Sequence, residues 1–354
     1  MIQRALHGRR MVHQRRLQVT LALAALLIAG RAGATDLDPA LYARAVQASV
    51  EIIVDGHLSA TGVVVDPAGW VITAGHAVVG HPTKVELRNR AMPRVPAEVV
   101  AFDRGHDIAL LRLPARAAPY PTMPLADAVP PPGAQVFLVG TPLYRHEVLI
   151  AGHVARDGPT WEYRPDQGHY MQMVMLAGPS PVGTSGGAWF DRAGRLVVIQ
   201  SGFIREGTSP VGVAQMGPVD AVRALAARRT DARTPTVGAA FEELWEHPTD
   251  VVQRYAPDFG VLLVILDVGG PADHAGLQRM DLITHVEGRP VKLRDDVLRA
   301  IWDGAPGEPL RVRVVRPGAT GPIEAVVTRA WLEGEGPGGL GVAPAGVNQA
   351  QQPR

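Results

Sequence analysis

Short apolar runs separated by turn residues dominate the chain from residue 50 to residue 216. Turns such as Asp66–Gly69 divide them, and helical periodicity is missing from this region. Many short strands at this spacing indicate a barrel or a sandwich. The strands are predicted at Val50–Val54, Gly62–Asp66, Trp70–Thr73, Lys84–Leu87, Ala97–Phe102, Asp107–Leu113, Gln135–Val139, Glu147–Val154, Gln172–Leu176, Leu196–Ser201 and Val211–Gln215.

Two helices and a proline-rich connection interrupt or flank these strands. A short helix is predicted from Asp38 to Ser49, and a second one follows Pro218 with an apolar face. Residues 114–132 contain seven prolines, which neither a helix nor a sheet interior tolerates. We therefore expect an internal connection between two halves of the strand-rich region.

The pattern changes after residue 229. Residues 230–236 read as a linker, and residues 237–331 as a smaller α+β domain. Its predicted elements are strands at Val261–Leu266 and Leu310–Val315, a short helix after Pro271 and a longer helix over Arg294–Trp302. Residues 332–354 are rich in Gly, Pro and Gln, which predicts a disordered tail. The strand-rich domain is accordingly expected at residues 35–229.

The first 34 residues have the order of a secretory signal peptide. Arginines come first, Leu17–Gly30 is a short apolar run, and Ala32–Ala34 ends it with small residues. Cleavage after Ala34 predicts a periplasmic or secreted protein, and an uncleaved membrane anchor is the alternative. The pair Arg15-Arg16 also admits a twin-arginine export route.

Composition excludes several classes of function. The 354 residues include 35 basic and 34 acidic side chains, a balance that argues against binding to nucleic acids or to membrane surfaces. There is no cysteine, so the chain has no disulfide, thiol nucleophile or thiolate metal site. No H-E-x-x-H motif is present either. We therefore expect no metal and no other cofactor.

A glycine-bracketed turn, Gly183-Thr184-Ser185-Gly186-Gly187, lies between two predicted strands. Glycines on both sides of Ser185 free the backbone to expose its hydroxyl and leave the amides of Gly183 and Ser185 able to face a developing oxyanion. Ser185 is therefore a candidate nucleophile. An ordinary glycine-rich turn with a capping serine is the alternative for the pentapeptide alone.

A serine nucleophile needs a base and an acid. His76 follows the apolar strand Trp70–Thr73 after two small residues, which presents its imidazole at the strand end. Asp107 opens another apolar strand and would hold that imidazole in one tautomer. Asp103 is the competing acid, and its polar neighbours favour a solvated position for it. A structural role is the alternative for His76.

The segments Thr73–Ala77, Asp107–Leu110 and Gly183–Gly187 occur in the order His, Asp, Ser. In this order they resemble the trypsin-like serine peptidases, and more closely their HtrA (Deg) branch, in which a signal-bearing peptidase precedes a PDZ domain. The resemblance covers roughly residues 48–331. It implies two six-stranded antiparallel β-barrels of the chymotrypsin type followed by a small α+β PDZ domain. It also implies that His76, Asp107 and Ser185 form a catalytic triad with an oxyanion hole of the Gly183 and Ser185 amides.

The resemblance also suggests substrates and partners. The position six residues before Ser185, which selects basic side chains when it is acidic, is Pro179. We therefore expect cleavage of misfolded or specific proteins after small or medium apolar residues. The family commonly has Asn-Pro-Gly-Asn-Ser-Gly-Gly where this chain has Pro181–Gly187, so we expect a different oxyanion loop and low or conditional activity. The branch commonly forms trimers through an aromatic-bearing N-terminal segment, but here only Tyr42 is aromatic before residue 50.

The PDZ resemblance rests on four short segments of the C-terminal domain, which are Gly270–Ala272, Ala275–Leu277, Asp281–Ile283 and Val286–Val291. PDZ domains bind peptide C-termini by strand addition. The best candidate for the carboxylate loop includes Val237, Gly238 and Ala239, beside the helix over Arg294–Trp302. A purely structural cap on the peptidase is the alternative for this domain.

Two further functions compete with the peptidase reading. Gly183-x-Ser185-x-Gly187 also fits an esterase nucleophile elbow, which needs a later acid and base such as Asp220 with His247, His274 or His285, in a parallel α/β sheet. The strand-rich region before Ser185 opposes that fold. A weak or inactive peptidase that acts only as a protein-binding module is the second alternative.

Overall fold

The computed structural model describes residues 37–80, 82–165, 167–206, 209–255 and 259–332. The expected signal peptide and the tail from residue 333 onward lie outside these residues. From Ala40 onward the chain forms one compact unit. None of the helices in the described ranges combines the length and the apolar character that crossing a bilayer requires.

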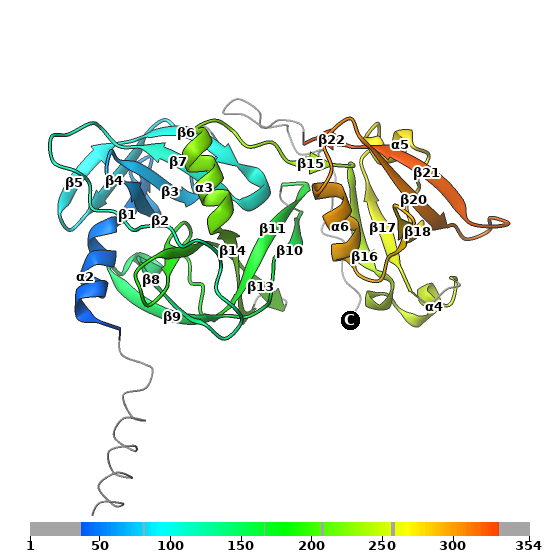
Figure 1. The fold of residues 1–354 in the computed structure, drawn as a ribbon, viewed down its shortest axis with the longest axis horizontal. Helices are drawn as coiled ribbons and strands as arrows, with labels where there is room; N and C mark the ends of the chain where they lie inside the picture. Colours follow the sequence, from blue (N-terminus) through cyan, green and yellow to red (C-terminus); the bar gives the residue numbers. More distant parts are fainter. Residues whose placement is uncertain (1–36, 81, 166, 207–208, 256–258, 333–354) are drawn as a thin grey trace, which may run out of the picture. The chain divides into compact units, whose positions relative to one another are not determined.

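The first large sheet follows helix α2 (Pro39–Ala48) and contains seven antiparallel strands in the order β5-β4-β1-β2-β3-β7-β6 (Figure 1). Its edge strand β5 was not predicted, because Pro93 and Pro96 argue against a strand; an edge position tolerates them. The bounds are β1 (Ser49–Val54), β2 (His57–Asp66), β3 (Trp70–Ala74), β4 (Val85–Asn89), β5 (Met92–Pro96), β6 (Glu98–Asp103) and β7 (Ile108–Arg112).

The second large sheet has the order β10-β11-β14-β13-β12-β8-β9, and an additional pairing of β11 with β9 closes it. Strand β10 pairs with β11 only, so the two form a hairpin that extends from the closed sheet. The bounds are β8 (Gln135–Gly140), β9 (Val148–Val154), β10 (Thr160–Arg164), β11 (His169–Ala177), β12 (Ala188–Phe190), β13 (Leu196–Glu206) and β14 (Ser209–Pro218), followed by α3 (Val219–Arg228).

The C-terminal α+β part is built on the sheet order β16-β17-β18-β20-β21, with β19 paired to β18. Strand β16 lies at the edge of this sheet, and a separate pair, β15 with β22, joins the two ends of the region. The strands are β15 (Pro235–Thr236), β16 (Ala239–Glu243), β17 (Val261–Leu266), β18 (Leu282–Val286), β19 (Arg289–Pro290), β20 (Pro309–Val315), β21 (Ile323–Thr328) and β22 (Ala330–Trp331), and the helices are α4 (Thr249–Val252), α5 (Pro271–His274) and α6 (Arg294–Trp302).

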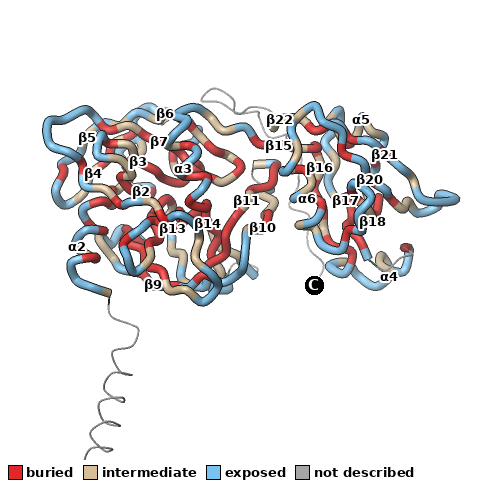
Figure 2. Tube along the Cα trace, viewed as in Figure 1, coloured by how far each residue is buried: buried red, intermediate tan, exposed pale blue. Residues whose placement is uncertain are grey.

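Each sheet has its own apolar core, and the buried residues follow the strands (Figure 2). Burial of these aliphatic and aromatic side chains is the main favourable contribution to folding. The core of the C-terminal part includes two residues of the β10–β11 hairpin, Trp161 and Tyr170. This hairpin therefore packs on the C-terminal sheet as well as belonging to the second one.

The expected architecture is observed: the chain is mostly β, with two antiparallel sheets followed by a small α+β part. In the described residues each large sheet counts seven strands rather than six, because β5 and β10 each add one hairpin strand. The parallel α/β sheet that an esterase elbow requires is therefore not the fold of this chain.

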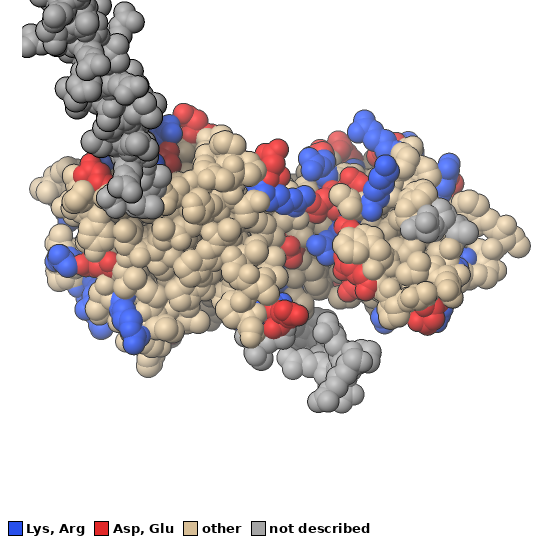
Figure 3. Space-filling model, turned by 90° about the horizontal axis from the view of Figure 1, so that it is seen from below, with Lys and Arg blue, Asp and Glu red and all other residues tan. Residues whose placement is uncertain are grey.

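Charged side chains of both signs are interspersed on the face shown in Figure 3. Uncharged surface separates them in this view. Exposed side chains of opposite charge pair locally in the described chain, such as Arg195 with Asp191 and Arg254 with Asp250. Exposed pairs of this kind contribute little to stability.

Candidate active site

His76 lies in a short 3₁₀ turn, η1 (Gly75–Ala77), directly after β3. The residue before it must be small, because a Cβ on Gly75 would lie 3.2 Å from Oδ1 and 3.3 Å from the carbonyl carbon of Asp107. The Gly75 N–H also donates to the Asp107 carbonyl at 2.9 Å. The sharp turn expected from Ala74-Gly75 thus brings the His76 backbone against Asp107.

Asp107 ends the turn η2 (Arg104–His106) just before β7, and its φ of 53° lies in the left-handed region. Its side chain is 2% exposed. Oδ1 accepts the His76 backbone N–H at 2.8 Å, Oδ2 lies 2.7 Å from His76 Nδ1, and the Ser201 hydroxyl also donates to Oδ2. The carboxylate therefore holds both the backbone and the ring of His76.

The contacts of this pair favour an ionised Asp107 and one tautomer of His76. Burial alone would raise the pKa of Asp107, but the hydrogen bonds from His76 and Ser201 and the nearby imidazole charge outweigh it and hold the pKa below its usual value. An ionised carboxylate keeps the proton on His76 Nδ1, which leaves Nε2 as the proton acceptor. The His76 ring is 32% exposed and so accessible from outside.

Ser185 lies in the turn between β11 and β12 that packs against the end of β3. A Cβ on Gly186 would lie 2.1 Å from Thr73 Oγ1 and 2.5 Å from the Ala74 nitrogen, so only glycine allows this approach. The Ser185 carbonyl accepts the Thr61 N–H at 2.9 Å. The close approach of Gly186 to Ala74 brings the serine turn to a residue that lies two positions before His76 in the chain.

Ser201, at the end of the apolar part of β13, joins the nucleophile to the acid. Its carbonyl lies 3.5 Å from Ser185 Oγ, while its hydroxyl donates to Asp107. Ser201 therefore contacts both Ser185 and the carboxylate that holds the His76 ring. Ser201 was not predicted as a site residue; the available signal was a polar residue at the end of the strand segment Leu196–Ser201, which is buried.

The two predicted oxyanion amides lie in the turn before and at Ser185, and their hydrogen bonds bear on that prediction. Gly183 has a φ of 95°, and the preceding carbonyl, on Val182, accepts the Leu143 N–H at 2.8 Å. Within the described chain, neither the Gly183 N–H nor the Ser185 N–H donates a hydrogen bond. Because Leu143 fixes the Val182–Gly183 peptide, the unusual approach to the nucleophile is anchored without a ligand.

The competing acid Asp103 is not solvated, contrary to expectation. It is buried, and both of its carboxylate oxygens lie 2.9 Å from His106 Nδ1. This partner was invisible in the sequence because the 3₁₀ turn that brings residues 103 and 106 together has no strong signal. Asp107 is thus the acid that contacts His76.

Two of the three late histidines named for an esterase have side-chain partners elsewhere, and the third ends a short helix. His247 pairs with Glu242 at 3.1 Å, His285 contacts Thr284 at 3.1 Å, and His274 ends the short helix α5. No group of three or more His, Asp or Glu side chains among the described residues gathers closely enough to hold a metal ion.

The expected peptide-binding residues lie where β15 turns into the edge strand β16. Val237 is buried in the core, and Gly238 adopts a φ of 67°. The Gly238 N–H donates to Thr236 Oγ1 at 3.1 Å, and its carbonyl accepts the Asp267 N–H at 2.9 Å. Ala239 then begins β16.

A side chain from the β10–β11 hairpin contacts β16 on the edge that faces away from β17. The Tyr170 hydroxyl donates to the Phe241 carbonyl at 2.9 Å and accepts the Phe241 N–H at 2.8 Å, and the two rings stack with centroids 6.3 Å apart. Since N–H and C=O of one residue in an antiparallel strand point the same way, these are the groups that an added strand would pair with. Burial raises the pKa of Tyr170, so its hydroxyl keeps its proton.

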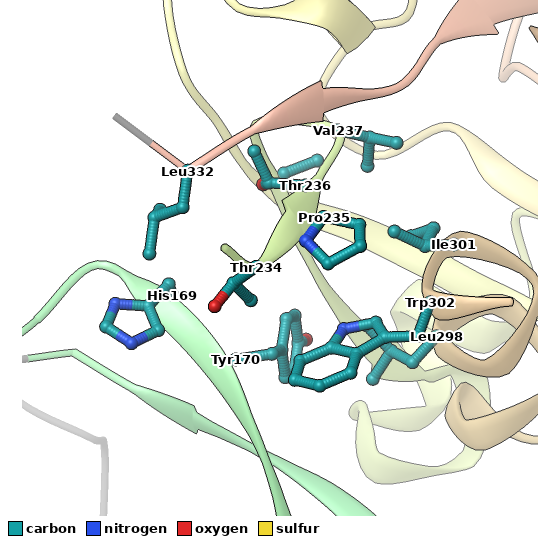
Figure 4. Close-up of a pocket in the computed structure, with 11 residues that line it drawn as sticks. His169, Tyr170, Thr234, Pro235, Thr236, Val237, Leu298, Ile301, Trp302 and Leu332 are labelled. Carbon is teal, nitrogen blue, oxygen red and sulfur yellow. The ribbon is translucent and has the colours of Figure 1, made fainter. Parts of the chain in front are cut away.

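Figure 4 shows the pocket beside this contact. Tyr170 and Trp302 approach it from the hairpin and from α6, respectively. Its lining consists of His169, Tyr170, Thr234, Pro235, Thr236, Val237, Ala239, Leu298, Ile301, Trp302 and Leu332. The groove between β16 and α6 is therefore partly filled by the chain itself.

Comparison with known protein families and proteins agrees with this architecture. Residues 60–199 match the family described as trypsin-like peptidase domain, and residues 235–327 match the PDZ domain family. The first match contains His76, Asp107 and Ser185. The second contains the segment Val237–Ala239.

Curated relatives are 22–27% identical to the chain over the aligned residues. A probable periplasmic serine endoprotease DegP-like from Ectopseudomonas mendocina is 24% identical over 280 residues, which cover 78% of this chain and 57% of the relative. Protease Do-like 1, chloroplastic, from Arabidopsis thaliana is 27% identical over 280 residues, 73% of this chain and 61% of the relative. The chain thus spans little more than half the length of these relatives.

Solved structures show the same fold. The serine endoprotease from Yersinia pestis aligns with a TM-score of 0.59 at 18% identity, over 85% of this chain and 100% of that one. The HtrA-type protease AlgW with a decapeptide aligns with a TM-score of 0.61 at 16% identity, over 82% of this chain and 98% of that one. The expected resemblance to the HtrA branch is confirmed by the family matches and the curated relatives, and the solved structures share the fold.

Proposed function

We propose that this chain, a DegP/HtrA homologue with a trypsin-like peptidase domain and one PDZ domain, is a serine endopeptidase that acts through Ser185, His76 and Asp107. The observation that carries the proposal is the position of Ser201. It contacts both Ser185 Oγ and the carboxylate that holds the His76 ring. An isolated glycine-rich turn would not need these partners.

The geometry supports the following sequence of steps. His76 Nε2 takes the proton of Ser185 as its oxygen bonds to the scissile carbonyl carbon, and the amides of Gly183 and Ser185 stabilise the oxyanion. The C–N bond breaks as the imidazolium returns the proton to the leaving amine, which leaves an acyl-enzyme. Water, deprotonated by His76, then attacks the ester and releases the acid and Ser185. Asp107 stabilises the imidazolium in both halves of the reaction.

Substrate selection follows from uncharged groups near the nucleophile. The segment before Ser185 is held to β13 by Ser180, whose hydroxyl donates to the Gly202 carbonyl at 3.2 Å and accepts from Gln200. No acidic side chain takes part in these contacts. We therefore propose cleavage of misfolded or specific proteins after small or medium apolar residues rather than basic ones.

We propose that the PDZ domain binds peptide C-termini beside β16, with Val237, Gly238 and Ala239 as the carboxylate loop. Tyr170 occupies the pairing groups of Phe241, so we propose that a peptide strand binds only when it displaces the hairpin side chain. The relative AlgW is named with bound peptides, which supports peptide binding in this domain type.

Export supports the same assignment. Several relatives are named periplasmic serine endoproteases, and residues 1–34 have the order of a signal peptide. We therefore propose that the protein acts in the periplasm or outside the cell, on protein substrates, with domain boundaries at residues 35–229 and 237–331. A homotrimer, as in the branch, is the proposed assembly.

A fluorophosphonate probe tests the catalytic assignment. The purified mature protein should be labelled at one site, and Ser185→Ala should abolish the labelling. His76→Ala should abolish casein cleavage. Labelling that persists in Ser185→Ala, or casein turnover that continues undiminished in His76→Ala, would contradict the proposed nucleophile or base.

A further inference from the structure

A second histidine, His106, lies one residue before Asp107, and the proposed mechanism does not use it. Its side chain is only 18% exposed. Nδ1 lies 2.9 Å from both oxygens of Asp103, and Nε2 lies 3.3 Å from Gln172 Oε1. The ring meets the Trp302 indole edge to face, with centroids 5.5 Å apart. One imidazole thus joins the turn before Asp107 to β11 and to the end of α6.

The same turn is in close contact with the C-terminal domain through Gly105. A Cβ at this position would lie 2.8 Å from the Trp302 ring and 2.9 Å from Thr234 Oγ1. The absence of a side chain at Gly105 therefore lets Trp302 pack directly on the turn. This contact and the His106 ring restrain the turn from two sides.

Asp107 depends on this restraint because its own backbone is strained. A φ of 53° is unfavourable for a residue with a side chain, and such conformations persist only where the surroundings determine them. The hydrogen bond from the Asp107 N–H to the Arg104 carbonyl is long, at 3.4 Å. The carboxylate position therefore depends on contacts made by the turn before it.

We propose that His106 is a positioning residue: its contacts with Asp103, Gln172 and Trp302 hold the η2 turn so that the Asp107 carboxylate meets the His76 ring. This inference rests on the proposed peptidase function. It also gives the PDZ helix α6 a direct contact with the turn that carries the triad acid, through Trp302.

The contacts of the ring suit a doubly protonated imidazole, because both nitrogens face an oxygen acceptor. The groups that face it are Asp103 on its own turn, Gln172 on β11, Trp302 on α6 and Asp220 on α3. Burial alone would lower the pKa of His106, but the two carboxylates and the two hydrogen bonds outweigh it and raise the pKa above its usual value.

His106 and Asp220 line a cavity of about 690 Å³, and other charged side chains line it as well. Asp231, Arg228 and Arg233 line this cavity too. Asp231 is engaged elsewhere, since it accepts the Phe102 N–H at 2.8 Å.

The sign of the pH effect follows from the raised pKa. The stabilising contribution of His106 is fully present below the unfolded value of about 6.5 and is lost as the pH rises through the raised folded value. Loss of one ring proton breaks the contact with Asp103 or with Gln172. Peptidase activity should therefore decline on the alkaline side as His106 loses its charge.

Steady-state kinetics of the full-length mature protein test the proposal with His106→Gln and Asp103→Asn. His106→Gln should lower kcat by about ten- to a hundredfold, as expected for a displaced catalytic group, with KM within about twofold. It should also remove the alkaline decline. Asp103→Asn should move that decline to lower pH, because it removes a carboxylate that raises the pKa of His106.

Thermal unfolding measured in parallel separates positioning from folding. A purely structural role would lower the Tm of both variants and leave the pH profile of the remaining activity unchanged, which would overturn the proposal. Unchanged kcat and pH profiles in both variants, with Ser185→Ala inactive, would overturn it as well. Full activity of Ser185→Ala would instead contradict the proposed function.

Discussion

The contact between Tyr170 and Phe241 allows a quantitative test of how the PDZ groove opens. Tyr170→Phe removes one oxygen atom and keeps the ring that stacks on Phe241. Both hydrogen bonds to the Phe241 backbone are lost, at 2.8 and 2.9 Å in the native protein. The substitution therefore acts on the groups for which a peptide ligand must compete.

The size of the effect follows from the two bonds. Each hydrogen bond between neutral groups contributes about 1 kcal/mol net, so the closed arrangement loses about 2 kcal/mol relative to the open one. A peptide that binds only the open arrangement should then bind up to about 30-fold more tightly, because 1.4 kcal/mol corresponds to a factor of ten. A peptide also restores the pairing of the Phe241 N–H and C=O by strand addition.

Fluorescence anisotropy with labelled peptides measures this change. The probe is a peptide library whose members end in an apolar residue with a free carboxylate, and amidated copies serve as the ligand control. Tyr163→Phe is the matched protein control. Tyr163 lies on the same hairpin, and the centroids of its ring and the Tyr170 ring are 5.1 Å apart. Its hydroxyl makes no hydrogen bond among the described residues, unlike that of Tyr170. Tyr163→Phe should leave the affinity within about twofold.

Two results would refute the reasoning. Equal or weaker peptide binding by Tyr170→Phe than by the native protein would show that the hydroxyl does not compete with ligands. Equal binding of amidated and free peptides would show that the loop at Val237–Ala239 does not hold a carboxylate.

Two further predictions concern the active site. Ser201→Ala removes a charge-assisted hydrogen bond to Asp107, so kcat should fall about tenfold with KM unchanged, while the exposed control Ser59→Ala should have no effect. The lowered pKa of Asp107 stabilises the fold above about pH 3.9, and this contribution is lost as the pH falls through the pKa of the folded state. Because the Ser201 hydrogen bond helps to lower that pKa, Ser201→Ala should also unfold at a higher pH on acidification. An unchanged acid midpoint would contradict this. Gly186 and Gly212 share a φ of 79°, but a Cβ would lie 2.1 Å from Thr73 Oγ1 at Gly186 and would meet nothing within 4 Å at Gly212. In urea unfolding, Gly212→Ala should lower the free energy of unfolding by about 1–2 kcal/mol, and Gly186→Ala should lower it by at least about 2 kcal/mol more. Equal losses would show that the turn does not pack on β3 as described.

Strands with strong apolar runs could be predicted from the sequence, whereas strands defined by their partners could not. β3 and β7 are short, buried and bounded by turn residues, so their pattern alone identifies them. β10 and β5 depend on the strand opposite them: β10 carries mixed aromatic and charged residues, and β5 contains two prolines. Phe241 of β16 contacts Tyr170, which lies 71 residues earlier in the chain. No local sequence pattern indicates such a contact.

The candidate site shows the same division for a physical reason. The sequence predicted Ser185, His76 and Asp107 as site residues because each lies at a glycine turn or at a strand end. Such local backbone features leave a signal in a few adjacent residues. Ser201 and His106 act through partners far away in the sequence: 94 residues separate Ser201 from Asp107, and 66 separate His106 from Gln172. Burial reversed the expectation for Asp103 as well, since its polar neighbours suggested solvent where the fold supplies an imidazole. The residues proposed to form the catalytic bonds can thus be predicted from local sequence, while the residues proposed to hold them in place are identified only where the two sheets and the PDZ helix meet.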